Sequence, residues 1–154
     1  MSNKITIREL APYLPYMLEI VTPHCEGYAD VMIGLRYNKF NEECVIDRDR
    51  RSWKVVQIQP MLRPLSDLTK SITVKGETFV PTDSICEILG ESKYKHLGYG
   101  MYGFSDKYGN MTIIQYGDEF VPDGCTVIIY DQLLSWHFDV FNLIPQGLAL
   151  PITE

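Results

Sequence analysis

The sequence lacks the spacings that mark common metal and disulfide frameworks. Its 154 residues include only three histidines and four cysteines, and the cysteines form no C-x-x-C pair. Zinc sites and disulfide-rich domains depend on closely and regularly spaced cysteine or histidine residues. We therefore expect reduced, mostly buried thiols and neither a metal nor a cofactor. The cysteines are Cys25, Cys44, Cys86 and Cys125.

Long apolar runs are also missing. No stretch approaches the roughly 20 apolar residues that cross a bilayer, and the opening MSNKITIREL lacks the apolar core of a signal peptide. The sequence therefore predicts a cytoplasmic protein without membrane contact. A chain of 154 residues with 45% hydrophobic residues can bury one core, so we expect a single compact domain over residues 1–154.

Positive charge is in deficit, because the chain carries a formal charge of −6. Nucleic acid is therefore an unlikely partner, since phosphate binding draws on a basic surface. Six of the 14 basic residues nevertheless lie between positions 36 and 54, interleaved with Glu42, Glu43, Asp47 and Asp49. Such mixed signs are more typical of a solvated turn than of a phosphate site.

Known catalytic motifs are absent from the sequence. It contains no G-x-S-x-G and no H-E-x-x-H, and a three-histidine metal site would need His24, His96 and His137 to converge. Whether the protein is an enzyme is therefore uncertain, and the sequence leans against it.

The hydrophobic pattern predicts an α+β fold, with a largely antiparallel sheet of about five or six strands, short helices and a C-terminal amphipathic helix packed on it. Thr6 and Glu9 have capping-box spacing. The expected strands are 16–22, 31–37, 44–47 and 53–59, a hairpin of 73–74 with 78–80, and a pairing of 99–104 with 111–116. The expected helices are a short one after Thr6, one over 65–72, one capped by Thr82 or Ser84 and stopped by Gly90, and one over 128–141.

The last of these helices would carry an unusually wide apolar arc, with Asp139 on the opposite side. An arc of this width needs more cover than one sheet face supplies. Two alternatives follow: the helix is central to the core, or it forms half of a self-association interface that makes the protein a homo-oligomer. The self-association candidates are Trp136, Phe138 and Phe141.

His137 falls in the middle of the same arc. A buried imidazole must find hydrogen-bond partners. It is either a ligand-binding or catalytic group, or a core histidine bonded to a backbone carbonyl, and the second interpretation is favoured.

The segment from Glu91 to Asn110 is rich in tyrosine, glycine and lysine and is the most loop-like part of the chain. Its aromatic rings could stack on a planar ligand while its cations bind an anionic group, which suits a nucleotide. The alternative is that tyrosine simply fits sheets and interfaces. The ligand-binding candidates are Tyr94, Lys95, His96, Tyr99, Tyr102, Lys107 and Tyr108.

Three stretches of the sequence carry a resemblance, the middle one in two parts. They are IRELAPYLPYML at 7–18, MLRPLSDLTKSI at 61–72, GETFVP at 76–81 and LLSWHFDVFNLIPQGLAL at 133–150. Together they resemble a family of small uncharacterised phage and prophage proteins of gut bacteria. The resemblance implies an accessory phage protein made in the cytoplasm of the infected host cell, and it carries over no functional residue.

These observations lead to three functional hypotheses. The first is a non-catalytic phage accessory protein that self-associates and binds a host protein or a nucleotide-like small molecule, for example in counter-defence. The second is a structural or assembly component of the phage particle. The third, which is less favoured, is an enzyme acting on nucleotides with His137 or His96 as base.

Overall fold

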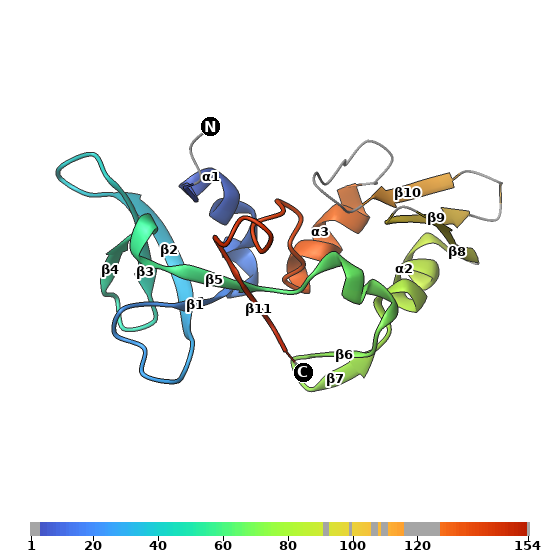
Figure 1. Cartoon of the computed structure of the whole chain (residues 1–154), viewed down its shortest axis with the longest axis horizontal. Coiled ribbons are helices and arrows are strands. Elements are labelled where there is room, and N and C mark those ends of the chain that lie inside the picture. The colour runs from blue at the N-terminus through green and yellow to red at the C-terminus, as the bar shows by residue number, and fades with distance from the viewer. Residues whose placement is uncertain are drawn as a thin grey trace.

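The main sheet of the protein has six strands. The computed structural model describes residues 4–90, 93–98, 100–105, 108, 111–115 and 127–153. Neighbouring strands run antiparallel except at one edge, where β11 pairs with β5 in parallel. The order across the sheet is β11 (Leu150–Pro151), β5 (Gln59–Leu62), β1 (Glu19–Val21), β2 (Asp30–Tyr37), β3 (Glu43–Asp47) and β4 (Ser52–Lys54). The prediction of a mainly antiparallel α+β fold is confirmed (Figure 1).

The chain enters this sheet through a short helical segment. Thr6 caps α1 (Ile7–Leu10), and the Glu9 carboxylate accepts the Thr6 N–H at 2.8 Å, which confirms the predicted capping box. The chain continues into the 3-10 helix η1 (Ala11–Tyr16), which ends at Met17 with φ +54°. Strand β1 therefore starts at Glu19, three residues later than the predicted start at Tyr16.

The predicted strand over 53–59 is broken in the middle. The chain leaves β4 at Lys54, forms a 3-10 turn, η2 (Val55–Gln57), and enters β5 at Gln59. The side chain of Gln57 accepts the Lys54 N–H at 3.0 Å, and Val55 is buried beneath the turn. This side-chain bond closes the turn, an alternative to ladder pairing that alternating hydrophobicity does not reveal.

A second hairpin follows the main sheet. The predicted helix over 65–72 is only a 3-10 helix, η3 (Leu65–Thr69), although Leu65 and Leu68 are buried as expected. Strands β6 (Ile72–Val74) and β7 (Glu77–Phe79) then pair around Lys75 and Gly76, whose φ angles of 51° and 84° suit a two-residue hairpin turn. The predicted hairpin is confirmed.

Helix α2 (Pro81–Leu89) starts earlier than predicted. Pro81 takes the first helical position, where its missing N–H costs nothing, so the helix begins after Val80 and not at Thr82 or Ser84. Gly90 ends the helix as expected.

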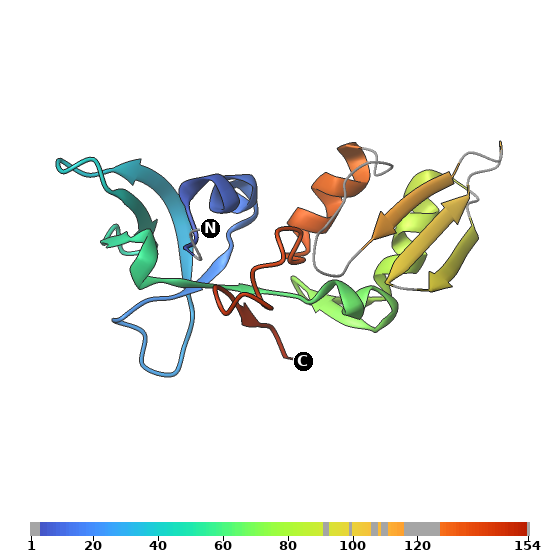
Figure 2. The ribbon, with the colours of Figure 1, turned by 45° about the horizontal axis from the view of Figure 1, so that its top comes forward.

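The region predicted to be most loop-like forms a three-stranded antiparallel sheet. Its strands are β8 (Lys93–Gly98), β9 (Met101–Ser105) and β10 (Met111–Gln115), in the order β10-β9-β8. The pairing of β9 with β10 confirms the predicted hairpin. This sheet and α2 form one end of the molecule, and the β2–β3 hairpin forms the other (Figures 1 and 2).

The predicted helix over 128–141 is wrong beyond Ser135. Helix α3 spans Val127–Ser135, and His137 then adopts φ +61°, which turns the chain into an extended segment. Phe138 forms a parallel bridge with Arg63, so this segment is tied to the chain just after β5. Asp139 is consequently buried and not on a solvent-facing side, and its carboxylate accepts the N–H groups of Leu143 and Ile144, both at 2.8 Å.

Most buried apolar side chains belong to one cluster that reaches from the main sheet to β9 and α3. Tyr13 joins its N- and C-terminal parts, because its hydroxyl donates to the Phe138 carbonyl at 2.6 Å and accepts the Val140 N–H at 3.3 Å. Burial raises the pKa of Tyr13 well above its usual range, so the hydroxyl keeps its proton and remains a donor.

Candidate functional site

The ligand-binding residues predicted between Glu91 and Asn110 do not gather on one exposed surface. Tyr102 is 3% exposed and packs in the core, whereas Lys95 and Tyr108 are exposed. Tyr94 and His96 are described only as backbone positions of β8, opposite Phe104 and Tyr102 in the ladder. Tyr99 and Lys107 lie outside the described residues.

The strand pleat explains why this aromatic segment is a poor stacking surface. Tyr102 and Phe104 are two positions apart in β9, so they share one face, and both are buried. Gly103 faces the other way and lies against the Leu97 side chain, where an added Cβ would come within 3.0 Å. The described aromatic side chains of β9 therefore belong to the core.

The predicted self-association residues are largely covered within one chain. Trp136 and Phe138 are buried, and Trp136 packs on Phe79 with a ring-centroid distance of 5.0 Å. Phe141 is half-buried and meets Tyr13 edge to face at 6.1 Å. The core accounts for these apolar side chains, and self-association remains a prediction.

The structure instead brings residues from distant parts of the chain around one hollow of about 540 Å³. It lies where the start of the main sheet, the β6–β7 hairpin and the end of α3 meet. We call it the Arg63–His137 cleft. Its lining residues are Tyr16, Met17, Glu19, Val31, Arg63, Thr73, Val74, Lys75, Ser135, Trp136, His137 and Ile152.

Backbone hydrogen bonds to the segment after α3 fix the position of Arg63 at the cleft. Its N–H donates to the His137 carbonyl and its carbonyl accepts the Asp139 N–H, both at 2.8 Å. The residue is only 7% exposed, and its guanidinium Nη2 donates to the Thr73 carbonyl at 2.8 Å. A guanidinium oriented in this way is a preformed donor for an anionic group.

His137 occupies the turn after α3. Its φ of +61° is uncommon for a residue with a side chain, although histidine tolerates it better than most. The ring Nε2 donates to the Tyr16 carbonyl at 2.7 Å, which agrees with the favoured interpretation of a histidine bonded to a backbone carbonyl. Burial lowers the pKa of His137, and the positive charges of Arg63 and Lys75 lower it further, so the imidazole is neutral near pH 7.

The charged groups of the cleft are two cations, Arg63 and Lys75, and one carboxylate, Glu19. With His137 neutral, the cleft has a net positive charge on a chain whose total is −6. The side chain of Trp136 contributes an aromatic wall, and Thr73 and Ser135 carry hydroxyl groups. The arrangement can hold an anionic group beside an apolar or aromatic body.

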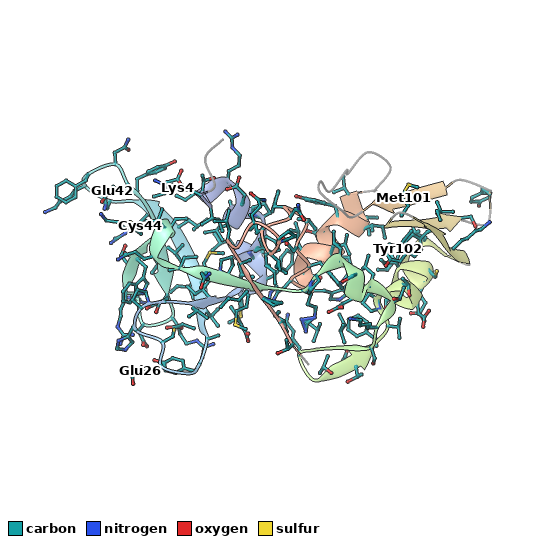
Figure 3. All side chains as sticks on the ribbon, viewed as in Figure 1. Lys4, Glu26, Glu42, Cys44, Met101 and Tyr102 are labelled. Carbon is teal, nitrogen blue, oxygen red and sulfur yellow. The ribbon has the colours of Figure 1, made fainter. Side chains whose placement is uncertain are left out.

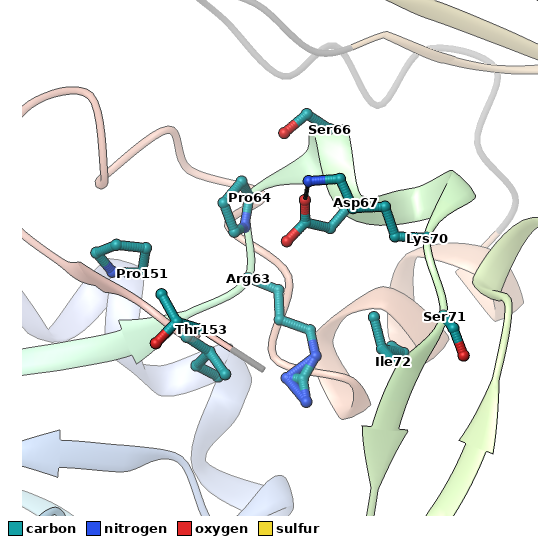
Figure 4. Close-up of a pocket in the computed structure, with 10 residues that line it drawn as sticks. Arg63, Pro64, Ser66, Asp67, Lys70, Ser71, Ile72, Pro151 and Thr153 are labelled. Carbon is teal, nitrogen blue, oxygen red and sulfur yellow. Dashed lines mark hydrogen bonds and ion pairs between the residues drawn. The ribbon is translucent and has the colours of Figure 1, made fainter.

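A second hollow of about 420 Å³ also borders Arg63 (Figure 4). It shares Arg63 and Ile152 with the cleft, and η3 forms one of its walls. Lys70 is paired there with Asp67 at 2.6 Å, which neutralises both charges. Arg63 is therefore the charged group that the two hollows have in common.

Sequence reasoning missed this cleft because its charged residues are 12 or more positions apart in the chain. One signal was available: Arg63 stands between Leu62 and Pro64 in an otherwise apolar segment. An arginine at such a position must be paired or must bind something once it is buried.

Cys25, Cys44 and Cys86 are free thiols, and Cys125 lies outside the described residues.

Comparison with known proteins adds no family. No family model matches the chain, and no curated protein or solved structure shows significant similarity to it. Within the described ranges, no three histidine, cysteine, aspartate or glutamate residues are grouped so as to hold a metal ion. The same ranges contain no helix long and apolar enough to span a bilayer.

Proposed function

We propose that the chain is a non-catalytic phage accessory protein that binds a small anionic molecule, of nucleotide-like size, in the Arg63–His137 cleft. The observation that carries this proposal is the meeting of Arg63, Lys75 and the Trp136 ring around one hollow of about 540 Å³. Small-molecule sites in proteins commonly have volumes of roughly 300–1,000 Å³ and combine an apolar wall with a few polar groups.

The charge distribution supports an anionic ligand. The chain as a whole carries a charge of −6 and repels anions, but the cleft itself has a net positive charge. Arg63 has a planar donor group that matches carboxylate or phosphate oxygens, and exposed Lys75 can adjust to the position of the charge. An anionic group can therefore be bound at this place despite the acidic surface around it.

The polar groups of the cleft favour binding over catalysis. Ser135 Oγ donates to the Gln132 carbonyl at 2.7 Å, so its proton is engaged within α3. His137 uses Nε2 to hold the Tyr16 carbonyl, which fixes the ring instead of leaving both nitrogens available. Turnover of a nucleotide that disappears in a His137 variant would support the enzyme alternative instead.

The test is isothermal titration calorimetry of the whole chain with adenosine monophosphate, inorganic phosphate and adenosine. We expect the monophosphate to bind more tightly than adenosine, because adenosine lacks the anionic group. Lys75→Gln should weaken monophosphate binding about tenfold, which corresponds to about 1.4 kcal/mol. Lys95→Gln is the matched control, because it removes another exposed lysine, from β8.

Three outcomes would contradict the proposal. If neither the monophosphate nor phosphate binds the native chain, the cleft is not an anion site of this class. If adenosine binds as tightly as its monophosphate, the charge plays no part. If Lys95→Gln reduces the affinity and Lys75→Gln does not, the site lies on the β8–β10 sheet.

A further inference from the structure

The end of the β2–β3 hairpin exposes two aromatic side chains beside two cations. Tyr37 is 58% exposed and Phe40 is 71% exposed, and the Lys39 Nζ lies 5.0 Å from the centre of the Phe40 ring. Arg36 is also exposed. We call these four residues the hairpin tip, and Figure 1 shows this hairpin at the far end of the molecule from α2.

The hairpin tip is rigid because Asn38 organises it. Its side-chain oxygen accepts the N–H groups of Phe40 and Glu42, at 2.9 and 3.0 Å, and its Nδ2 donates to the Glu42 carboxylate at 2.8 Å. The Asn41 N–H returns to the Asn38 carbonyl at 2.9 Å. A preorganised loop loses less conformational entropy when it binds, so its exposed rings are well suited to an interface.

The positive charges of the hairpin tip are not cancelled by the neighbouring carboxylates of Glu42 and Glu43. Glu42, labelled in Figure 3, is ion-paired with Lys54 at 2.8 Å, and the Glu43 carboxylate accepts the Ile7 N–H at 2.9 Å. Arg36 and Lys39 form no ion pair with any other residue that the structure describes. Positions 36–54 carry six basic and four acidic residues, a net charge of +2 that leaves −8 on the rest of the chain.

A hollow of complementary character lies between the β6–β7 hairpin, the start of α2 and Trp136, away from the hairpin tip. Its volume is about 510 Å³ and its lining includes the rings of Phe79 and Trp136, whose centroids are 5.0 Å apart. Glu77 stands on its wall, and exposed Asp83 lies nearby in the first turn of α2. Neither carboxylate forms an ion pair within the described part of the chain. We call this the Glu77–Trp136 hollow.

We infer that the hairpin tip of one copy docks in the Glu77–Trp136 hollow of a second copy. The Phe40 ring would meet the Phe79 and Trp136 rings, and Lys39 and Arg36 would face Glu77 and Asp83. The β2–β3 hairpin and the β6–β7 hairpin lie well apart in the chain's fold, so one copy cannot make the contact with itself (Figure 1). A reciprocal exchange of the two contacts closes a two-fold dimer, whereas a contact made one way only repeats into a ring or an open filament.

A second copy suits these observations better than another macromolecule. The same chain provides both the basic aromatic tip and the acidic aromatic hollow, whereas a nucleic acid would be repelled by the charge of −8 outside positions 36–54. One hairpin tip buries little area, so each contact is weak and sensitive to salt. The inference does not rest on ligand binding in the Arg63–His137 cleft, although Trp136 lines both the cleft and this hollow.

The test is sedimentation velocity over a wide range of protein concentration, at low and at high salt. We expect the native chain to associate as its concentration rises, and salt to reverse the association. Phe40→Ala should weaken the association at least tenfold. Lys39→Glu and Glu77→Lys should each do the same, and the double variant should recover most of it, because the exchanged charges again attract each other.

Arg48→Glu is the matched control, since it makes the same charge change at an exposed turn on the other end of β3 and should leave the association unchanged. A native chain that stays monomeric at every concentration overturns the inference. So does an association that Phe40→Ala does not reduce, or one that the double variant fails to restore. Monophosphate binding by Lys39→Glu, measured in parallel, should equal that of the native chain.

Discussion

The Arg63–His137 cleft and the β8–β10 sheet differ in how far apart their residues lie in the sequence. The cleft takes Glu19, Arg63, Lys75 and His137 from four separate segments of the chain. The sheet comes from one continuous stretch whose aromatic and basic residues look like a site when they are read in a row. In the structure the cleft has the convergent polar groups, and the described rings of β9 are buried.

The difference follows from how each element presents its side chains. A strand sends successive residues to opposite faces, so a run of aromatic residues is divided between two surfaces. Residues at the junction of several elements can converge on one point without any regular spacing. A cluster in sequence is therefore weaker evidence for a site than a charged residue at a position that must be buried.

The largest expected effect is on the free energy of unfolding, when aromatic side chains of the β8–β10 region are removed. Phe104→Ala should lower the free energy of unfolding by about 3–5 kcal/mol, because the ring is fully buried. Tyr108→Ala should change it by less than about 0.5 kcal/mol, since Tyr108 is 78% exposed. Urea unfolding of both variants is the measurement. Equal losses would show that Tyr108 also packs in the core.

The next effect is on the segment that supports the cleft. Asp139→Ala should cost about 2–4 kcal/mol, because the N–H groups of Leu143 and Ile144 lose their acceptor. Asp83→Ala, which removes an exposed carboxylate from α2, should cost about 0.5 kcal/mol or less. Chemical denaturation measures both changes. A loss below 1 kcal/mol for Asp139→Ala would mean that these N–H groups find other acceptors.

A smaller effect separates charge from geometry in the cleft. Arg63→Lys keeps the positive charge but removes the planar fork and the hydrogen bond to the Thr73 carbonyl. We expect monophosphate affinity to fall about tenfold and the free energy of unfolding to fall by about 1–2 kcal/mol. Lys95→Arg should change neither quantity. Undiminished affinity in Arg63→Lys would show that Arg63 serves the fold alone.

The smallest expected effect is on the pH dependence of stability. The pKa of His137 is lower in the folded chain than its ordinary value of 6.5, so the unfolded chain binds a proton first as the pH falls. Folding should therefore lose stability as the pH falls below about 6.5, by at most about 1.4 kcal/mol per pH unit. Thermal melts of the native chain and of His137→Asn, which suits the positive φ, measure this slope. An equal slope in both would assign it to other groups.

The sequence predicted the regular parts of the fold well. Strand β2, strand β3 and the β6–β7 hairpin follow from β-rich runs bounded by turn residues, and the Thr6–Glu9 capping box formed as expected. The errors occur where side chains or backbone override periodicity. Gln57 closes a turn inside an alternating run, and His137 ends a helix that its apolar neighbours would have continued.

The site was harder to predict than the fold, for a physical reason. Periodicity gives the face of an element, but the cleft depends on how β5, the β6–β7 hairpin and the end of α3 lie relative to one another. Those positions are set by the bridge between Arg63 and Phe138, which joins residues 75 positions apart. No local pattern in the sequence encodes that pairing.

The same bridge orders events during synthesis of the chain. Phe138 and β11 both pair with the segment around β5, yet they leave the ribosome 75 or more residues after it. Until then the edge of β5 is unpaired, and the Tyr13 hydroxyl lacks the Phe138 carbonyl as its hydrogen-bond acceptor. The N-terminal sheet cannot be completed during early translation, so a nascent chain of this protein would offer an open sheet edge to chaperones.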